Sequence, residues 1–245
     1  LIVEERVLGV INVIDKASGD SFCETDVNLL CTIAGQVSIA VENARLYEAL
    51  EENCFNMVTA LAKSLEAKDK YTSGHSQRVA EYSSVMARTM GVSDKDMTTL
   101  RHAALLHDIG KIGISEFIIN KTDKLNDTEF ATIKSHPCQG EQIIKPLTFL
   151  DDAIHHIRSH HESFDGRGYP DRLGGDDLSL LTRIMTVADA FDAMTSDRTY
   201  RSSMKTNKAV SELRRVAGKQ FDPEVVDAFA SSEIVKMKSD LESNY

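Results

Sequence analysis

The sequence has few helix-breaking residues: four prolines and thirteen glycines among 245 residues, and it has no tryptophan at all. These shortages argue against a turn-rich all-β fold and against collagen-like sequence, while 42% hydrophobic residues argue against disorder. The apolar opening, residues 1–14, carries charged side chains, lacks a basic leader and is too short to span a bilayer. We therefore expect a mainly α-helical, cytoplasmic protein with no membrane segment in this chain. Because the chain lacks an initiating methionine, we also expect an upstream part to be missing.

Positively charged residues are also scarce. The sequence has 28 Lys and Arg residues and 38 Asp and Glu residues, which gives a formal charge of −10. Such a chain repels polyanions, so we expect no DNA binding, and an anionic substrate requires metal ions or locally clustered cations. The four cysteines have no CxxC spacing, which predicts reduced thiols packed as small core residues. They are Cys23, Cys31, Cys54 and Cys138.

The first sixty residues combine a strand pattern with a long helical pattern. Residues 1–3 and 7–14 are rich in β-branched side chains and predict strand, turn, strand. Apolar residues then recur every three or four positions over 25–44, and a second stripe over 47–61 follows after a phase slip. This spacing predicts one long helix, which either packs on its own domain's sheet or pairs two chains. Beyond residue 60 the patterns are mainly helical.

The eight histidines form the strongest signal in the sequence, because several stand in pairs or beside carboxylates. His107 and Asp108 lie in the otherwise apolar stretch Leu105–Lys111, where an unpaired carboxylate costs several kcal/mol to bury. A cation is therefore expected at Asp108. Adjacent helical residues diverge by about 100°, so His107 can bind one ion while Asp108 bridges to a second.

A second cluster, residues 155–162, reads HHIRSHHE. Its spacing allows either a helical i, i+4 pair, His156 with His160, or a tandem pair, His160 with His161, and spacing alone does not choose between them. A solvated histidine-rich face is the non-functional alternative. Asp189 again places a carboxylate inside an apolar helical run, where a buried acid requires a partner. His75 and His136, each taken alone, are typical of capping or polar-contact residues.

In chain order, these motifs resemble the HD-GYP subgroup of the HD phosphohydrolase superfamily over about residues 55–230. The matching segments are YTSGHS at 71–76, HDIGKIG at 107–113, SHP at 135–137, HHE through GYP at 160–170, VADAFDAMTSDR at 187–198 and FDP at 221–223. So many motifs in the same order make chance agreement remote.

The resemblance implies an all-helical domain that holds metal ions and hydrolyses the bacterial messenger cyclic di-GMP. One ion would be bound by three side chains, namely His75, His107 and Asp189. The other would be bound by His136, His160 and His161, with Asp108 bridging the two. A donor set of imidazoles and carboxylates without thiolate favours iron or manganese. Tyr71 stands where some members have a third-ion glutamate, so two ions are expected.

The resemblance also assigns roles in the reaction. His107, Asp108 and Lys111 would be catalytic, with Lys111 meeting a phosphate oxygen. Arg198 and Arg201 would bind the phosphates or guanines of the substrate. Two ions about 3.5–4 Å apart supply hydroxide at neutral pH and stabilise the phosphate oxygens. Attack on phosphorus in line with the 3′-oxygen would give linear pGpG and, after a second cleavage, GMP.

Residues 1–50 resemble the end of a GAF sensor domain, through the strand pattern at 9–12 and the helix end ENARLY at 42–47. The expected organisation is therefore a partial α/β GAF domain with its connecting helix over 1–50 and an HD-GYP phosphodiesterase domain over 51–245. A homodimer through the connecting helix is expected. Two other functions remain open: a non-catalytic cyclic di-GMP receptor, and a binuclear iron oxygenase.

Overall fold

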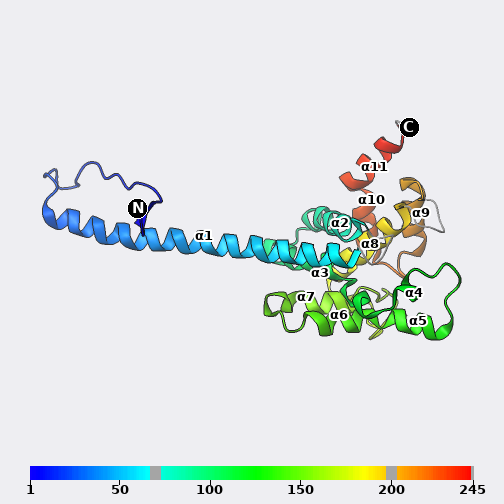
Figure 1. Ribbon diagram of the computed structural model, residues 1–245. Helices are drawn as coiled ribbons and strands as arrows, with labels where there is room; N and C mark the ends of the chain where they lie inside the picture. Colours follow the sequence, from blue (N-terminus) through cyan, green and yellow to red (C-terminus); the bar gives the residue numbers. More distant parts are fainter. Residues whose placement is uncertain (67–72, 197–202, 244–245) are drawn as a thin grey trace. The chain divides into compact units, whose positions relative to one another are not determined.

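The computed structural model describes residues 1–66, 73–196 and 203–243, and it is mainly α-helical as predicted (Figure 1). Its contacts divide the chain into two compact units, Leu1–Met57 and Val58–Tyr245. Among the described residues, no helix combines the length and the hydropathy needed to cross a lipid bilayer.

The first unit contains a short hairpin and most of one long helix. Strand β1 (Ile2–Val3) pairs antiparallel with β2 (Arg6–Val7), with Ile2 opposite Val7. The predicted second strand over 7–14 is wrong beyond Val7. Leu8 and Gly9 still form backbone hydrogen bonds with Leu1, but among the described residues no strand lies opposite residues 10–14. Helix α1 (Glu24–Glu66) runs without interruption through the phase slip, so the prediction of a single long helix is confirmed.

The cysteines are free, but the prediction that they are core residues is wrong. Cys23 and Cys31 are exposed, and Cys54 and Cys138 are half-buried. Cys23 precedes α1, whereas Cys31 and Cys54 lie on it, and α1 is the only helix of the first unit. Most of the helix circumference there has nothing to pack against, so residues on it face outward.

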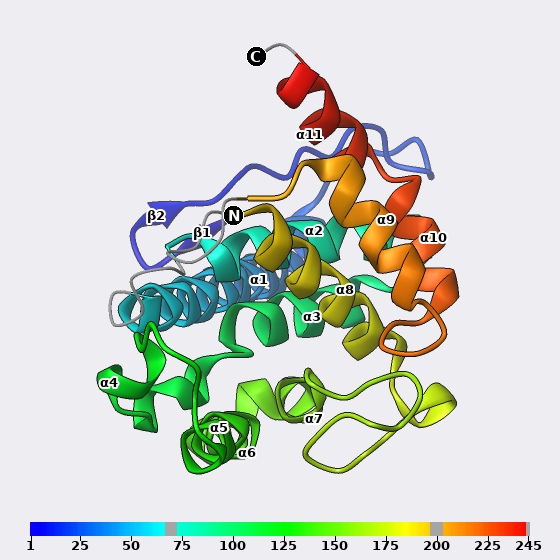
Figure 2. The ribbon, with the colours of Figure 1, turned by 90° about the vertical axis from the view of Figure 1, so that its right-hand side faces the viewer.

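Apart from an isolated β-bridge between Ala217 and Phe221, the regular elements described in the second unit are helices (Figure 2). They are α2 (His75–Thr89), α3 (Asp94–Leu106), η1 (Ile109–Gly113), α4 (Glu116–Ile119), α5 (Asp127–Lys134), α6 (His136–Ile144), η2 (Thr148–Leu150), α7 (Asp151–Ser159), η3 (Gly175–Asp177), α8 (Leu180–Thr195), α9 (Thr206–Val216), α10 (Pro223–Ala230) and α11 (Glu233–Ser243). Helix α2 packs on α3 and α8, while α7 packs on α3 and α6. Helices α9 and α10 pack on α8.

The core lies where α2, α3 and α8 meet. Met86, Leu100, Ile184 and Phe191 are fully buried there, and burying each such side chain stabilises the fold by roughly 1.5–3 kcal/mol. The same three helices carry or border four of the residues singled out in the sequence, namely His75, His107, Asp108 and Asp189. Packing therefore fixes the backbone from which these polar side chains project.

The start of α2 is held by a side chain from the end of α1. Gly74 adopts the left-handed conformation, with φ of 70°, and His75 is the first residue of the helix. The Glu66 carboxylate accepts hydrogen bonds from the backbone N–H groups of Gly74, at 2.7 Å, and Ser76, at 2.9 Å. This acceptor satisfies helix donors that would otherwise lack a partner and fixes the direction in which α2 begins.

A close backbone contact joins η1 to α6. A Cβ atom added to Gly110 would lie 1.9 Å from the carbonyl oxygen of His136 and 2.6 Å from the backbone nitrogen of Gly140. Only glycine therefore fits at position 110. The contact brings Asp108, just before η1, close to His136 at the start of α6.

We predict that Gly110→Ala lowers the free energy of unfolding by at least 1–3 kcal/mol, the usual range for overpacking, since ~1.9 Å is far inside contact distance. The control is Gly35→Ala, because Gly35 is exposed in α1 and an added methyl group meets no atom within 4 Å. That substitution should stabilise the helix by about 0.5–1 kcal/mol. Urea unfolding followed by circular dichroism measures both, and an unchanged midpoint for Gly110→Ala would contradict the close packing.

Candidate metal centre

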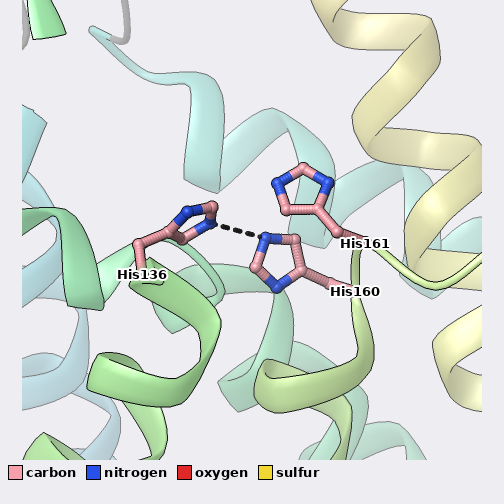
Figure 3. Close-up of side chains that lie close together, drawn as sticks. All are labelled: His136, His160 and His161. Carbon is pink, nitrogen blue, oxygen red and sulfur yellow. Dashed lines mark hydrogen bonds between the residues drawn. The ribbon is translucent and has the colours of Figure 1, made fainter. Parts of the chain in front are cut away.

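Seven side chains from five separate segments of the chain meet near the ends of several helices. His75 begins α2, His107 and Asp108 separate α3 from η1, His136 begins α6, and His160 and His161 follow α7, while Asp189 lies within α8. The ligand atoms of His136, His160 and His161 all lie within 4.8 Å of one another (Figure 3). The same holds for His75, His107 and Asp108. Two three-residue groups of possible metal ligands thus form in the second unit.

Three of the imidazole rings are oriented by the last turn of a preceding helix. The Nδ1 atoms of His107, His136 and His160 lie 2.7–2.8 Å from the backbone carbonyl oxygen three residues earlier. Each histidine stands just after the end of α3, α5 or α7, where carbonyls lack helical partners. A carbonyl only accepts hydrogen bonds, so Nδ1 carries the proton in all three rings. In the neutral ring, Nε2 then presents a lone pair.

These lone pairs face one another. His136 Nε2 lies 3.0 Å from His160 Nε2, a contact that is unfavourable between two unprotonated nitrogens unless a cation neutralises it. Burial, followed by the neighbouring histidines, lowers the pKa of His160 well below its usual value. Burial lowers the pKa of His161 to about 4. Both rings are therefore neutral at pH 7, the form that binds metal ions.

Asp108 belongs to the group with His75 and His107 and also contacts the other group, through His136. Its Oδ1 is 3.3 Å from Nε2 of His136, and its Oδ2 is 3.5 Å from Nε2 of His107. Lys111 places its Nζ 2.6 Å from the same Oδ2. Burial alone would raise the pKa of Asp108, but Lys111 and the two histidines hold it well below the usual range. The buried carboxylate is ionised and can bridge two cations.

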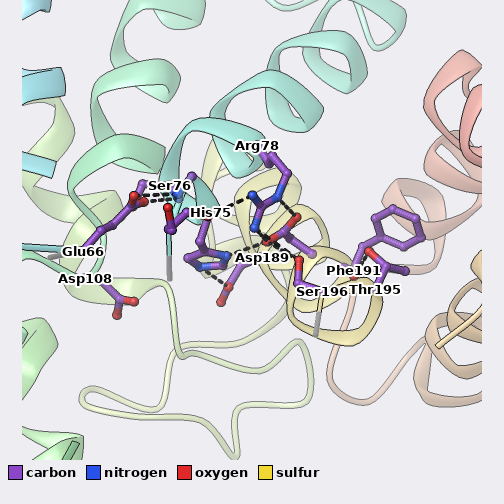
Figure 4. A network of polar contacts seen from close by, with 12 residues as sticks. Glu66, His75, Ser76, Arg78, Asp108, Asp189, Phe191, Thr195 and Ser196 are labelled. Atoms are coloured by element: carbon purple, nitrogen blue, oxygen red, sulfur yellow. Dashed lines mark hydrogen bonds and ion pairs between the residues drawn. The ribbon is translucent and has the colours of Figure 1, made fainter. Parts of the chain in front are cut away.

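The His75 ring has carboxylates on both nitrogens (Figure 4). Asp189 Oδ1 lies 3.2 Å from Nε2, and the fully buried Asp192 accepts from Nδ1 at 2.8 Å. Arg78 donates to both oxygens of Asp192, at 2.7 and 3.0 Å. Burial lowers the pKa of His75, but Asp189 and Asp192 outweigh it and raise the pKa to about 10.

Sequence reasoning missed the roles of Asp192, Arg78 and Glu66. The available signal for the first two was helical spacing, because Asp192 follows Asp189 by three residues, and Arg78 follows His75 by three. A carboxylate behind a ligating imidazole fixes its tautomer and orientation. Asp192 is this carboxylate for His75, and Arg78 in turn holds Asp192 in place.

Other histidines lie outside both groups. His156 is buried, and its Nδ1 is 2.8 Å from Oγ1 of Thr182 and 3.1 Å from Oγ of Ser179, at the start of α8. The helical pair of His156 with His160 is therefore not the pair that the fold brings together. His155 is exposed, and His102 packs edge-on against Phe149. Tyr71, Arg198 and Arg201 lie outside the described residues.

The segment after α7 forms one wall of the centre. Oε1 of Glu162 accepts from the backbone N–H groups of Asp171, at 2.6 Å, and Arg172, at 2.9 Å, which closes the loop on itself. The Tyr169 ring stacks on His161, with ring centres 4.9 Å apart and planes 27° apart. The Tyr169 N–H also donates to the carbonyl oxygen of His161, at 3.2 Å. The loop thus holds an aromatic ring against a candidate ligand.

A sequence profile of the HD domain family matches residues 59–225, more than half of the chain. The chain belongs to the HD domain family, so the predicted superfamily is confirmed. This family binds divalent metals, and the two ligand groups have suitable donors for them. The match begins after the segment that resembles a GAF domain, which stays a prediction.

Curated relatives carry names of cyclic dinucleotide phosphodiesterases. The 3′3′-cGAMP-specific phosphodiesterase 3 of Vibrio cholerae is 44% identical over 168 residues, which cover 69% of this chain and 36% of the relative. The cyclic di-GMP phosphodiesterase of Thermotoga maritima is 37% identical over 187 residues, covering 75% and 50%. The chain spans half or less of the length of these two relatives.

Solved structures share the fold. A cyclic GMP-AMP specific phosphodiesterase of V. cholerae superposes with a TM-score of 0.56 at 18% identity, covering 74% of this chain and 48% of that one. A protein from Bdellovibrio bacteriovorus, described as an HDG"Y"P protein, gives a TM-score of 0.58 at 21% identity, covering 79% of this chain and 63% of that one. At these identities the likeness establishes the fold alone.

His156 and His160 lie one helical turn apart but have different surroundings. We therefore predict that substituting them has different effects on metal content. His156→Gln should retain metal, because an amide can replace the hydrogen bond to Thr182. His160→Gln should lose metal, because it removes a lone pair from the centre. Elemental analysis after anaerobic loading with manganese measures both, with circular dichroism as the folding control. Equal losses in the two variants would contradict this placement.

Proposed function

We propose that this chain is a metal-dependent phosphodiesterase that hydrolyses cyclic di-GMP to pGpG and then to GMP. The observation that carries the proposal is the pair of adjoining ligand groups with the ionised Asp108 between them. Phosphodiesters are anionic and resist attack, so a chain of formal charge −10 needs bound cations to hold one. The names of the relatives support a cyclic dinucleotide as the substrate.

The proposed centre holds two divalent ions. One is bound by His75, His107 and Asp189, the other by His136, His160 and His161, with Asp108 shared. Imidazole and carboxylate donors without thiolate suit iron or manganese. When bound, such ions lower the pKa of water and neutralise charge on the phosphate oxygens.

The chain's own residues hold and position the reactants. Asp108 keeps its charge at neutral pH and holds the Lys111 ammonium 2.6 Å from one of its oxygens. Lys111 is then at the edge of the centre, where it can contact an oxygen of the reacting phosphate. His107 completes the proposed catalytic group with these two residues. Arg198 and Arg201, outside the described residues, remain the predicted contacts to the rest of the substrate.

A second substrate, 3′3′-cGAMP, is favoured by one observation. The relative at 44% identity is named for specificity toward that compound. The two substrates share the phosphodiester chemistry and differ in one base. The metal centre therefore does not distinguish them, and side chains around the bases have to do so.

The N-terminal part is proposed as a sensor and pairing segment. Residues 1–50 would form the end of a GAF-like domain, 51–245 the phosphodiesterase domain, and the whole would act in the cytoplasm. The α1 stripe supports a homodimer, because Tyr47, Leu50 and Met57 are exposed by 72%, 57% and 55%. Their heptad-like spacing is the one at which apolar side chains pack against a second helix in a coiled coil.

Incubation of the anaerobically iron- or manganese-loaded protein with each of three compounds tests the function. They are cyclic di-GMP, 3′3′-cGAMP and cyclic di-AMP, and chromatography identifies the products. We expect pGpG followed by GMP from cyclic di-GMP. Tight binding without products would indicate a receptor. Oxygen consumption without binding of any of the three would indicate the oxygenase.

Asp108→Ala should abolish turnover and lose at least one metal ion per chain, because the carboxylate shared by both ligand groups is removed. Helical content should remain largely intact. The matched control is Asp152→Ala, since that carboxylate is 65% exposed on α7 and should leave both readouts unchanged. Full metal occupancy in Asp108→Ala, measured by elemental analysis, would refute the shared role.

A further inference from the structure

Lys134, the last residue of α5, lies beside the metal centre without belonging to it. Its Nζ is 4.7 Å from the ring centre of Phe130, one turn earlier on the same helix. It is also 5.0 Å from the ring centre of Tyr169. Since Tyr169 stacks on His161, the ammonium is separated from a candidate ligand by one aromatic ring. Lys134 thus stands at the wall of the centre.

Two other cations near this wall, Lys111 and Arg158, are engaged by carboxylates. Lys111 pairs with Asp108, and Arg158 pairs with Glu141 and Asp171. In the part of the chain that the structure describes, Lys134 forms no ion pair. Two ring faces hold its ammonium by cation–π attraction, which fixes the position but leaves a full positive charge.

The proposed substrate carries a second negative charge, away from the phosphodiester that is being hydrolysed. A cyclic dinucleotide carries two phosphodiesters on opposite sides of one macrocycle, and only one can lie at the metal centre at a time. The other remains anionic in a chain with ten more acidic than basic groups. A positive side chain beside the centre would stabilise it.

We propose that Lys134 binds the phosphodiester that is not being hydrolysed, an assignment that rests on the proposed function. Tyr169 and Phe130 position the ammonium for this contact.

A purely structural role for Lys134, in which it holds Tyr169 against His161, makes a different prediction. Loss of that role would disturb the metal centre itself. Hydrolysis of any phosphodiester would then fall to a similar extent. Loss of a contact to the second phosphate would affect only substrates that have one.

The experiment compares two substrates with metal-loaded wild type and Lys134→Gln. They are the cyclic dinucleotide that wild type hydrolyses and bis(p-nitrophenyl) phosphate, which has a single phosphodiester.

We expect KM for the cyclic dinucleotide to rise about tenfold with kcat changed less than twofold, the size of one lost charge-assisted contact. The kcat/KM for the small diester should fall less than twofold, and Lys134→Arg should restore most of the affinity. Lys145→Gln, which removes an exposed charge at the end of α6, is the matched control and should behave as wild type.

The outcomes separate the two proposals. Equal KM values for the cyclic dinucleotide in wild type and Lys134→Gln overturn the role of Lys134 and leave the proposed function standing. Equal losses on both substrates also overturn it, in favour of the structural role. Hydrolysis of the small diester by wild type without turnover of any cyclic dinucleotide contradicts the proposed function and, with it, this inference.

Discussion

The candidate centre depends on one repeated hydrogen bond, from the Nδ1–H of a histidine to a carbonyl in the last turn of the preceding helix. His107, His136 and His160 all make it. The bond uses a carbonyl that a helix end leaves without a partner, and it leaves Nε2 as the only free acceptor on each ring. Because the helices are packed into one core, the three Nε2 atoms converge on one region. The ends of α3, α5 and α7 thus provide both the backbone and the protonation state that a metal ligand requires.

Much of this arrangement could be predicted from the sequence, because the motifs occur in a distinctive order. The mainly helical fold, the long first helix and the HD domain family follow from periodicity and from those motifs. The ligand geometry does not follow from spacing alone: His156 and His160 are equally plausible on a helix, and only the contact of His156 with Thr182 separates them. The tertiary contact that removes one histidine from the centre has no local signature.

The missed and wrong predictions have one physical cause. Each concerns a residue whose environment depends on a partner that is distant along the chain or absent. Asp192 supports His75 across 117 residues of sequence, so a helical pattern shows only that it is buried. The strand pattern at 7–14 needs a neighbouring strand, and the cysteines on α1 need a covering surface. Within the first unit neither is present. In each case the local sequence has the expected type of side chain. Whether those side chains are buried, or the strand is paired, depends on the segment that packs against them.

The two ligand groups differ in how they take up a cation, and the difference follows from their charges. His160 and His161 are already neutral at pH 7, so binding there displaces no proton from either ring. His75, with a pKa raised to about 10 by Asp189 and Asp192, carries a proton at pH 7 that a metal ion has to displace. Affinity at the His75 group should therefore rise with pH until that pKa is reached, whereas His160 and His161 should add little pH dependence to the other group near neutral pH. A proton shared with carboxylates stabilises the first group when it is empty. In the second group, the Nε2 atoms of His136 and His160 lie 3.0 Å apart, so a cation bound to both would remove the repulsion between their lone pairs.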